Sequence, residues 1–380
     1  MPGPLKTLFV VFNRIGDLTT STPLYRALAR DRKLSLLTRP FGVALLGSQS
    51  YLERVYALRY PNRGRSRLGN LFLGGHRRAL GRELRGAGFD EVLIYAGERP
   101  VIKRWLDALF PGRVTEIPQS TPPASHVAER YREAAAHLGC DMERYEADPV
   151  LDITSASRAE ATRRLALLGE RREHGARRQP WQHREAGEPG PRVVGIQMGS
   201  QRTSAGRLVG ARPNLKTLSA RQWGALITRL LDGGHADAIA LHGAPGETKM
   251  VGAFLRTLPE TIRRRCHDLS ASVGLDLLPA LLASHYALIS VDTGPAHIAA
   301  AVGCPVLVFF GPTDPAVFRP RGKGPIQLLT GEASCQFCHR TPLYKTCRDN
   351  RCLNRLPDDR LWEAWMALRG QVNAISPVTC

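Results

Sequence analysis

The chain has 380 residues, of which 43% are hydrophobic, and this length exceeds the size at which one hydrophobic core usually stops growing, so we expect two domains. Lys and Arg outnumber Asp and Glu by 53 to 34, giving a net charge of +19 that favours a polyanionic partner: nucleic acid, anionic lipid or a phosphorylated glycolipid. The hydrophobic run Leu8–Phe12 is too short for a signal peptide, and the longest hydrophobic passage, 298–310, is split by Gly303 and Pro305 and too short for a membrane span. We therefore expect a cytoplasmic protein with only peripheral membrane contact.

Short β-prone runs alternate with helical stretches through the first half. We expect a strand at 7–12, a helix from about 18 to 30, a strand at 34–38, and an Arg-rich helix before a strand at 91–95. This alternation predicts a parallel sheet covered by helices in a first domain, 1–170. Basic residues gather at 63–67 and 77–78, either to contact an anionic acceptor or simply as solvated faces.

A polar stretch rich in Gly, Pro and Arg at 171–191 is predicted to be a linker or an exposed insertion. A second α/β domain, 192–357, follows. Its expected elements are a strand at 193–197, a helix at 219–231, a strand at 238–242, a helix from about 247 and a strand at 286–291. The pair Ser219 and Gln222 has the spacing of a capping box, which supports the helix start there. A last helix at 358–368 opens the C-terminal segment 358–380.

The segment 289–301 combines the end of a buried strand, a polar turn and a helix start. Thr293 can cap the helix, and Pro295 suits its first turn, where backbone N–H groups would face an anion. In open parallel sheets ligands bind at the carboxyl ends of strands, where Asp292 and His297 would project. The alternative is that Asp292 and Thr293 only cap the helix and that His297 is an ordinary core histidine.

Three blocks stand in order along the chain. They are Ile15-Gly16-Asp17-Leu18 with 20–24, Gly195-Ile196-x-x-Gly199-Ser200 with Lys216 before Trp223, and Asp292-Thr293-Gly294-x-x-His297 with Ala299-Ala300-Ala301 and Phe310-Gly311-Pro312-Thr313-Asp314-Pro315. Together they resemble the signature of glycosyltransferase family 9, the family of the lipopolysaccharide heptosyltransferases. The resemblance implies the GT-B architecture, in which two Rossmann-like domains face each other across a cleft and the last helix crosses back to the first domain.

Inverting glycosyl transfer needs a carboxylate base near the acceptor hydroxyl, and cations or N–H groups for the departing diphosphate. Asp17 matches the family's catalytic base; its alternative role is to cap the helix that starts at Leu18. For the phosphates, Gly199 and Ser200 offer close backbone approach and Lys216 a positive charge. Residues 204–212 look like an insertion, so Arg207 or Arg212 could take the place of Lys216.

The remaining donor residues follow from the same resemblance. Glu247 matches an acid that contacts the nucleoside ribose, although it could also be an ordinary acid of a first helical turn. Asp292, Thr293 and Gly294 are expected to hold the donor sugar and phosphate, with Asp292 accepting hydrogen bonds from sugar hydroxyls and His297 supporting the loop. A site of this kind needs no divalent metal for catalysis.

Four of the eight cysteines lie close together, as Cys335, Cys338, Cys347 and Cys352. Disulfides are disfavoured in the cytoplasm, and four thiolates at this spacing suit a tetrahedral metal, zinc or alternatively iron. His339 could replace one thiolate. We expect a metal here to stabilise a loop rather than take part in chemistry; the alternative is that the cluster binds nothing.

The leading hypothesis is a transferase that moves heptose from ADP-heptose to a phosphorylated, lipid-linked lipopolysaccharide core at the inner membrane surface. A second hypothesis within the family is transfer to a protein or another polysaccharide. A basic nucleic-acid-binding protein with a metal-binding cysteine cluster is a third, but aromatic residues are only 7% and no nucleic-acid-binding signature occurs. An NAD-dependent oxidoreductase is disfavoured because no Gly-x-Gly-x-x-Gly follows an expected strand.

Overall fold

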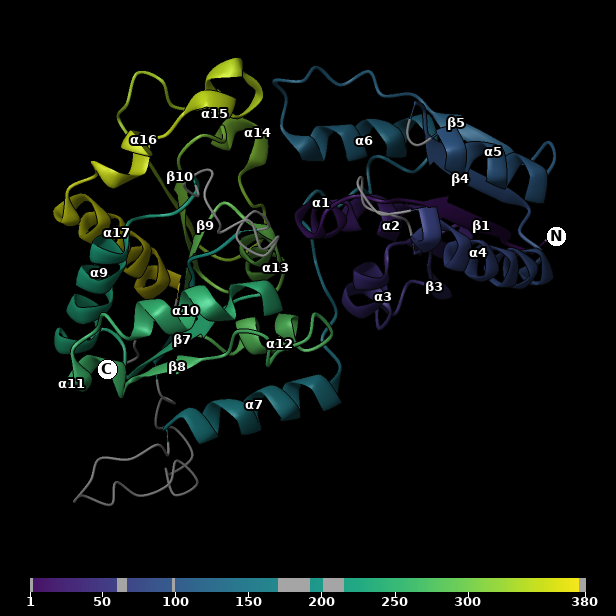
Figure 1. The fold of residues 1–380 in the computed structure, drawn as a ribbon. Coiled ribbons are helices and arrows are strands. Elements are labelled where there is room, and N and C mark those ends of the chain that lie inside the picture. Colours follow the sequence, from purple (N-terminus) through teal and green to yellow (C-terminus); the bar gives the residue numbers. More distant parts are fainter. Residues whose placement is uncertain (1–2, 60–66, 98–99, 170–191, 201–214, 376–380) are drawn as a thin grey trace. The chain divides into compact units, whose positions relative to one another are not determined.

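The computed structural model describes residues 3–59, 67–97, 100–169, 192–200 and 215–375. The chain divides into two compact units, Met1–Asp152 and Ile153–Cys380, and each has its own parallel sheet (Figure 1). The sequence placed the end of the first domain at residue 170, whereas the division falls after Asp152. The predicted linker 171–191 lies outside the described residues.

The first unit is a five-stranded parallel sheet in the order β3-β2-β1-β4-β5, which is the order of a doubly wound fold. Its strands are β1 (Leu5–Val10), β2 (Arg32–Thr38), β3 (Arg54–Ala57), β4 (Glu91–Tyr95) and β5 (Val114–Ile117). Its helices are α1 (Ile15–Thr20), α2 (Thr22–Leu28), α3 (Pro40–Leu46), α4 (Arg67–Ala87), α5 (Pro100–Leu109) and α6 (Val127–His137). Because the three inner strands β2, β1 and β4 are buried along most of their length, the sheet is the centre of this unit's core.

The single helix expected from about 18 to 30 is two helices, α1 and α2, separated by Ser21. Pro23 has no N–H to donate, so it suits the first turn of a new helix rather than the middle of a continuous one. The Ser21 hydroxyl donates to the Leu18 carbonyl at 3.0 Å and closes the end of α1. Since α1 begins at Ile15, Asp17 lies inside its first turn and not in a preceding loop.

The second unit is a six-stranded parallel sheet in the order β11-β10-β9-β6-β7-β8. Its strands are β6 (Val193–Gln197), β7 (Ala238–His242), β8 (Cys266–Asp268), β9 (Ala287–Val291), β10 (Val306–Phe310) and β11 (Ile326–Thr330). Its helices are α7 (Ser155–Gly169), α9 (Ala220–Asp232), η2 (Pro245–Glu247), α10 (Thr248–Leu255), α11 (Glu260–Arg263), α12 (Leu278–Ala283), α13 (Gly294–Ala301), α14 (Pro315–Phe318), η3 (Cys338–Arg340), α15 (Pro342–Thr346), α16 (Arg351–Asn354) and α17 (Asp358–Ile375). This too is the doubly wound order, with β6 and β9 side by side at its centre.

Small residues bring α13 close to the second sheet. Ala296, Ala299 and Ala300 are fully buried, and the helix ends before Gly303, whose φ of +79° lies in the left-handed region. The loop between α14 and β11 also packs against this helix, because a Cβ on Gly322 would collide with the Ala300 carbonyl. The N-terminus of α13 is therefore held at a fixed depth at the edge of the sheet.

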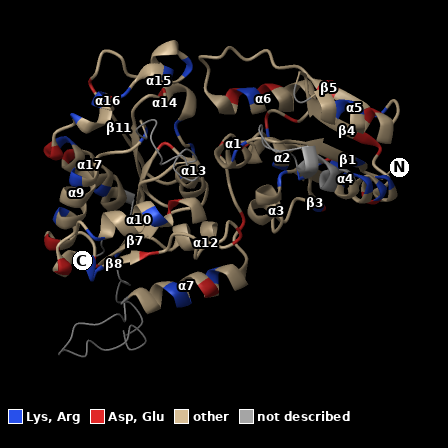
Figure 2. Ribbon diagram, viewed as in Figure 1, with Lys and Arg blue, Asp and Glu red and all other residues tan. Residues whose placement is uncertain are grey.

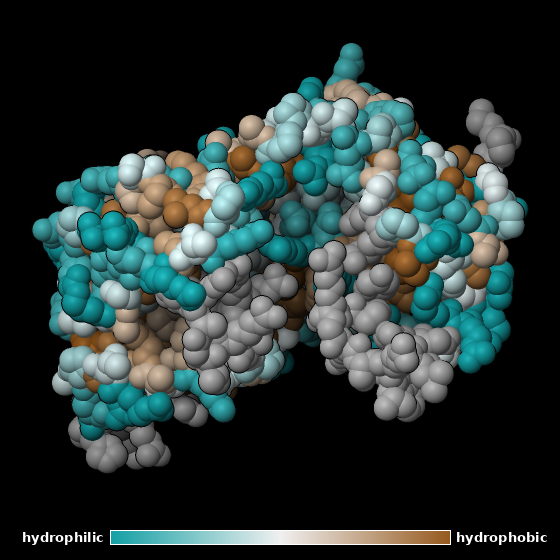
Figure 3. All heavy atoms as spheres, turned by 45° about the horizontal axis from the view of Figure 1, so that its top comes forward, coloured by the Kyte–Doolittle hydropathy of each residue, from teal (hydrophilic) through white to brown (hydrophobic). Residues whose placement is uncertain are grey.

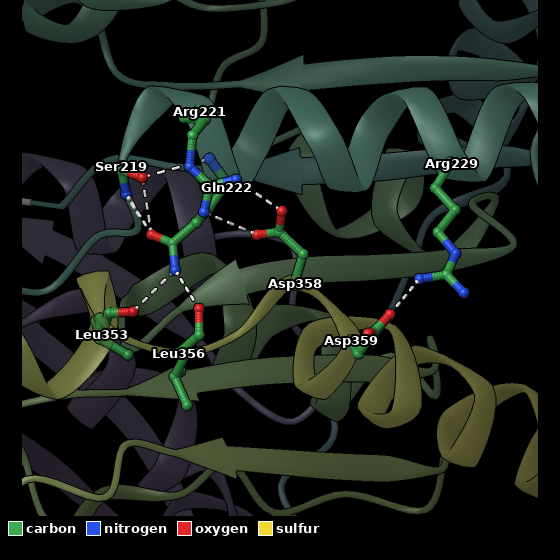
Figure 4. A network of polar contacts seen from close by, with 8 residues as sticks. All are labelled: Ser219, Arg221, Gln222, Arg229, Leu353, Leu356, Asp358 and Asp359. Atoms are coloured by element: carbon green, nitrogen blue, oxygen red, sulfur yellow. Dashed lines mark hydrogen bonds and ion pairs between the residues drawn. The ribbon is translucent and has the colours of Figure 1, made fainter.

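The last helix packs on the core of the second unit. Leu361, Trp365 and Leu368 of α17 belong to the core that includes Trp223 of α9 and Phe309 of β10. Two exposed ion pairs join α17 to α9, from Arg221 to Asp358 at 2.7 Å and from Arg229 to Asp359 at 3.0 Å (Figure 4). The predicted capping box at the start of α9 is confirmed, with Ser219 as N-cap and Gln222 as its partner.

Among the described residues, no helix has both the length and the hydrophobicity needed to cross a bilayer. The large hydrophobic side chains that are exposed lie apart along the sequence: Leu5, Val101, Leu167, Leu343 and Met366. On the face shown in Figure 3, hydrophobic residues interrupt a largely hydrophilic surface in small patches. Isolated exposed hydrophobic residues of this kind are ordinary for a folded protein surface.

Candidate functional site

The candidate site of the second unit lies at the carboxyl edge of its sheet. Chain connections leave β6 and β9 in opposite directions, and this is the position where open α/β sheets bind ligands. Four loops meet the edge there. They follow β6 (Met198–Ser200), β7 (Gly243–Ala244 and η2), β9 (Asp292–Thr293) and β10 (Gly311–Asp314). Every donor-binding residue predicted from the sequence except Lys216 follows one of these strands directly or through the helix after it.

Lys216 and Asp292 form a nearly buried ion pair. Lys216 Nζ lies 2.6 Å from Asp292 Oδ2 and 3.5 Å from the Asp292 carbonyl oxygen, and the two side chains are 16% and 9% exposed. Burial alone would raise the pKa of the Asp292 carboxyl, but the Lys216 ammonium outweighs it, and the Thr313 hydroxyl and His297 add to the effect, so this pKa lies below its usual value. In this structure the carboxylate holds the lysine; its expected hydrogen bonds to sugar hydroxyls stay a prediction.

The N-terminus of α13 adds a partial positive charge beside this pair. Thr293 occupies the N-cap position in an extended conformation, but its side chain makes no capping hydrogen bond. Since Asp292 is paired with Lys216, the alternative in which both residues serve only to cap the helix does not describe the structure. His297 is buried on the same helix and close enough to Asp292 to lower its pKa. Backbone N–H groups and the helix dipole suit an anion here.

Glu247 is buried and turned back toward the loop after β6. Its Oε2 accepts from the Ala244 N–H at 2.8 Å and from Gln197 Nε2 at 3.4 Å, so it is not a solvated acid of a first helical turn. A Cβ on Gly199 would collide with the Glu247 carboxylate, which explains why glycine is needed there. Ser200 is also buried. The predicted insertion 204–212, with Arg207 and Arg212, lies outside the described residues.

Sequence reasoning missed two polar residues of this site. Gln197 ends a strand that is otherwise entirely hydrophobic, and its amide also donates to the Gly199 carbonyl at 3.1 Å. An amide side chain at the end of a hydrophobic strand is the sequence signal by which Gln197 could have been identified. Thr313, which is 2% exposed, lies beside Asp292. The sequence places Thr313 in a family-like motif but predicts no role for it, because nothing in the sequence indicates which strand end this residue faces.

A buried histidine pair lies behind the loop after β7. His242 Nε2 and His285 Nε2 are 2.7 Å apart, so one ring donates and the other accepts. Burial lowers the pKa of His242 to about 4 and that of His285 well below its usual value. Both rings are therefore neutral at pH 7. A Cβ on Gly195 would lie 2.6 Å from the His285 ring, so a glycine in β6 leaves the space for it.

Asp17 lies in the first unit, at the carboxyl edge of β1 next to β4. The N-cap of α1 is Arg14, so Asp17 does not serve as the cap, and its carboxylate stands in the first turn at the positive end of the helix. Burial and then the Asp17 charge raise the pKa of Tyr131, which places the buried phenol near this carboxylate. Asn13 Nδ2 donates to the Tyr131 hydroxyl at 3.3 Å.

The four clustered cysteines are neighbours in space. Burial is the main cause that raises the pKa of Cys352 to about 11, and the other three thiols nearby add to this effect. Burial also raises the pKa of Cys338, with smaller contributions from Cys347 and Cys335. Cys347 Sγ donates to the Asp349 carbonyl and Cys352 Sγ to Asn350 Oδ1. Within the described part of the chain, no group of three or more His, Cys, Asp or Glu is arranged to hold a metal ion. A metal at these cysteines stays a prediction.

The basic surplus is spread over helices of both units (Figure 2). Several arginines of the second unit are paired with acids, as Arg221 and Arg229 are. In the first unit, Arg77 of α4 stands over the Trp105 ring at 5.3 Å, while most of the predicted basic run 63–67 lies outside the described residues.

Two doubly wound parallel units, and the likeness of the whole chain to solved heptosyltransferase structures, make this a protein of the GT-B fold. The chain belongs to glycosyltransferase family 9 (heptosyltransferase), whose family model matches residues 113–346. Among curated relatives, lipooligosaccharide heptosyltransferase 2 of Haemophilus influenzae is 30% identical over 132 residues. That match covers 33% of this chain and 38% of the relative.

Solved structures match over nearly the whole chain. The glycosyl transferase family 9 protein of Veillonella parvula has a TM-score of 0.70 at 15% identity, covering 96% of this chain and 97% of that one. ADP-heptose lps heptosyltransferase II of E. coli has a TM-score of 0.67 at 16% identity, covering 97% and 99%. At these identities the likeness shows a shared fold.

Proposed function

We propose that this protein transfers a heptose from ADP-heptose to a phosphorylated lipopolysaccharide core acceptor, with inversion at the anomeric carbon. The observation that carries the proposal is the Lys216–Asp292 pair beside the N-terminus of α13, in a chain that belongs to family 9. The name of the similar E. coli enzyme supplies the donor by analogy.

The leaving group is the part of the reaction that these residues suit best. As the bond between the anomeric carbon and the diphosphate breaks, negative charge builds up on the β-phosphate oxygen of ADP. Lys216 and the N–H groups of α13 are groups that stabilise such charge when they are held in place beforehand. Asp292 accepts from Lys216 Nζ at 2.6 Å and so orients the ammonium before the phosphate arrives. Glu247 would bind the ribose.

Asp17 is the proposed general base. It would take the proton of the acceptor hydroxyl while that oxygen forms its bond to the anomeric carbon and the electron pair of the broken bond leaves with ADP. An ionised carboxylate within reach of that hydroxyl can accept this proton. Its partly exposed position at the carboxyl edge of β1 supports this role. Tyr131 and Asn13 would help to hold the α1 loop.

For the acceptor, the net charge of +19 favours a polyanion, and a phosphorylated glycolipid at the inner membrane surface fits both the charge and the family. Transfer to a protein or another polysaccharide remains the second candidate within the family. Membership in a glycosyltransferase family argues against the nucleic-acid-binding hypothesis.

The first test is nucleotide binding, measured as the thermal shift of the purified protein with ADP, UDP, GDP or CMP. We expect ADP alone to raise the melting temperature, and Lys216→Ala to abolish the shift. Lys345→Ala, a lysine exposed on α15, is the matched control and should respond like the wild type. A preference for another nucleotide would discard the heptose donor, and no response to any of them would discard the proposed function.

We also propose that Cys335, Cys338, Cys347 and Cys352 bind a structural zinc or iron ion. The support is their spacing, their mutual influence on pKa and the suitability of thiolates for these metals. Elemental analysis of protein purified without chelators should find about one metal ion per chain in the wild type and less in Cys338→Ser. Cys304→Ser, at a buried cysteine after α13, should retain the metal. Metal-free wild-type protein would contradict the proposal.

A further inference from the structure

The segment 331–356, which contains all four clustered cysteines, is called the cysteine segment below. It follows β11, includes η3, α15 and α16, and ends before α17 (Figure 1). Nothing in the reaction proposed above uses this segment. Its hydrogen bonds, however, reach the residues that flank both members of the Lys216–Asp292 pair.

The first contact is made by Asn350, whose side chain is buried and only 3% exposed. Its Nδ2 donates to the Thr217 carbonyl at 2.6 Å. Thr217 is the residue after Lys216, and its hydroxyl accepts from Trp223 Nε1 at 3.0 Å. Thr217, the neighbour of Lys216, is thus fixed through its carbonyl by the cysteine segment and through its hydroxyl by the core.

The second contact reaches the other member of the pair. The Phe337 N–H donates to the Gly311 carbonyl at 3.3 Å, and the His339 N–H donates to the Pro312 carbonyl at 2.8 Å. The next residue in that turn is Thr313, which lies beside Asp292 and lowers its pKa. Phe337 has a φ of +62°, a left-handed conformation that a bulky side chain rarely adopts.

A third set of contacts holds the segment itself in place. The fully buried Gln222 side chain of α9 donates to the carbonyls of Leu353 and Leu356 at 3.0 and 2.9 Å (Figure 4). A Cβ on Gly311 would lie 2.9 Å from the Leu353 side chain, so α16 packs directly on the turn after β10. The segment is therefore a rigid connection between the two donor-site loops.

We propose that the cysteine segment positions Lys216 and Asp292 for the donor diphosphate, and that Asn350 is the positioning residue on the Lys216 side. The proposal rests on the function proposed above. Asn350 acts through the Thr217 carbonyl and touches neither substrate. Its loss therefore weakens donor binding and leaves the chemical step nearly unchanged.

The test compares ADP dissociation constants, measured by calorimetry, and the steady-state constants for ADP-heptose. The variants are Asn350→Ala and a control, Asn354→Ala, which truncates an exposed asparagine at the end of α16. For Asn350→Ala we expect Kd for ADP and KM for ADP-heptose to rise about tenfold, the effect of losing one buried hydrogen bond, with kcat changed less than about twofold. Asn354→Ala should match the wild type.

Circular dichroism at the assay temperature establishes that each variant is folded. If Asn350→Ala is unfolded, Asn350→Ser replaces it under the same criterion, since serine still suits the N-cap of α16 but is shorter than asparagine. A folded Asn350 variant with the Kd and KM of the wild type overturns this inference alone. A variant that loses kcat with unchanged KM also overturns it. Failure of the wild type to bind ADP overturns the proposed function and this inference together.

Discussion

Replacing Lys216 by methionine should destabilise the protein by leaving the Asp292 carboxylate buried without its cation. At the observed 2.6 Å, and with an effective dielectric constant of about 20, the attraction between the two charges is about 6 kcal/mol before the cost of removing them from water. Removing one partner of such a pair usually lowers the free energy of unfolding by about 3–5 kcal/mol. Since the Lys216 side chain is 16% exposed, we expect a value near the lower end.

The effect should depend on pH. In the wild type the pKa of Asp292 is below 3.8, so its contribution to stability is present above that pH and is lost as pH falls through the lowered pKa. In Lys216→Met burial acts unopposed, so the pKa of Asp292 rises and the folded state binds the proton more tightly than the unfolded state. The stability of the variant then falls as pH increases toward that raised pKa. The difference from the wild type therefore grows as pH rises from about 4 to 7.

Urea unfolding of the wild type, Lys216→Met and Lys216→Met/Asp292→Asn at several pH values measures these differences. The double variant removes the buried charge, so it should recover most of the stability at pH 7 while still failing to bind ADP. Lys345→Met, at an exposed lysine of α15, should behave like the wild type. The reasoning is refuted if the loss of stability in Lys216→Met is the same at pH 4 and pH 7, or if the second substitution recovers none of it.

Three other predictions follow from the same structure. Asp17→Asn should lower kcat by a factor of about 10²–10⁴ with ADP affinity unchanged, and a full transfer rate would exclude Asp17 as the base. Gly199→Ala should raise the Kd for ADP at least about tenfold, because the added methyl group collides with the Glu247 carboxylate. The control Gly86→Ala, where the added Cβ meets nothing within 4 Å, should leave this Kd unchanged. Equal calorimetric affinities of the two variants would contradict the prediction. Because burial lowers the pKa of His242 to about 4, the unfolded chain takes up a proton there that the folded chain does not, so this residue alone should lower the free energy of unfolding by about 3 kcal/mol as pH drops from 6.5 to about 4. His285, whose pKa burial also lowers, adds a slope of the same sign. In His242→Gln, measured by urea unfolding, the slope should become shallower without disappearing, and an unchanged slope would contradict the assignment.

The central strands could be predicted from the sequence because a buried parallel strand is hydrophobic on both faces. The strands at 91–95, 193–197 and 238–242 were predicted residue for residue. The edge strands β3 and β8 were not, because they have few residues and little hydrophobic character to distinguish them from loops. The break between α1 and α2 was missed as well, since a proline is compatible with both a helix start and a turn.

The candidate site could be predicted as a set of residues but not as a set of contacts. Loops at strand ends are visible in the sequence, so Glu247 and Asp292 could be named. The pairing of Lys216 with Asp292 joins residues 76 positions apart, and only the sheet order brings them together. A metal at the four cysteines was expected only to stabilise a loop. The hydrogen bonds from the cysteine segment to residues near Lys216 and near Asp292 could not be predicted, because they also join residues far apart in the sequence.

The alanines of α13 have a consequence for how this protein can change over evolutionary time or be re-engineered. Methyl groups at 296, 299 and 300 set the distance between the helix and the strands beneath it, so any larger side chain would lift the anion-binding end away from the sheet. Substitutions that alter which sugar is accepted should therefore accumulate in the surrounding loops. In homologous chains we expect only alanine, glycine or serine at these three positions, even where the loops differ completely.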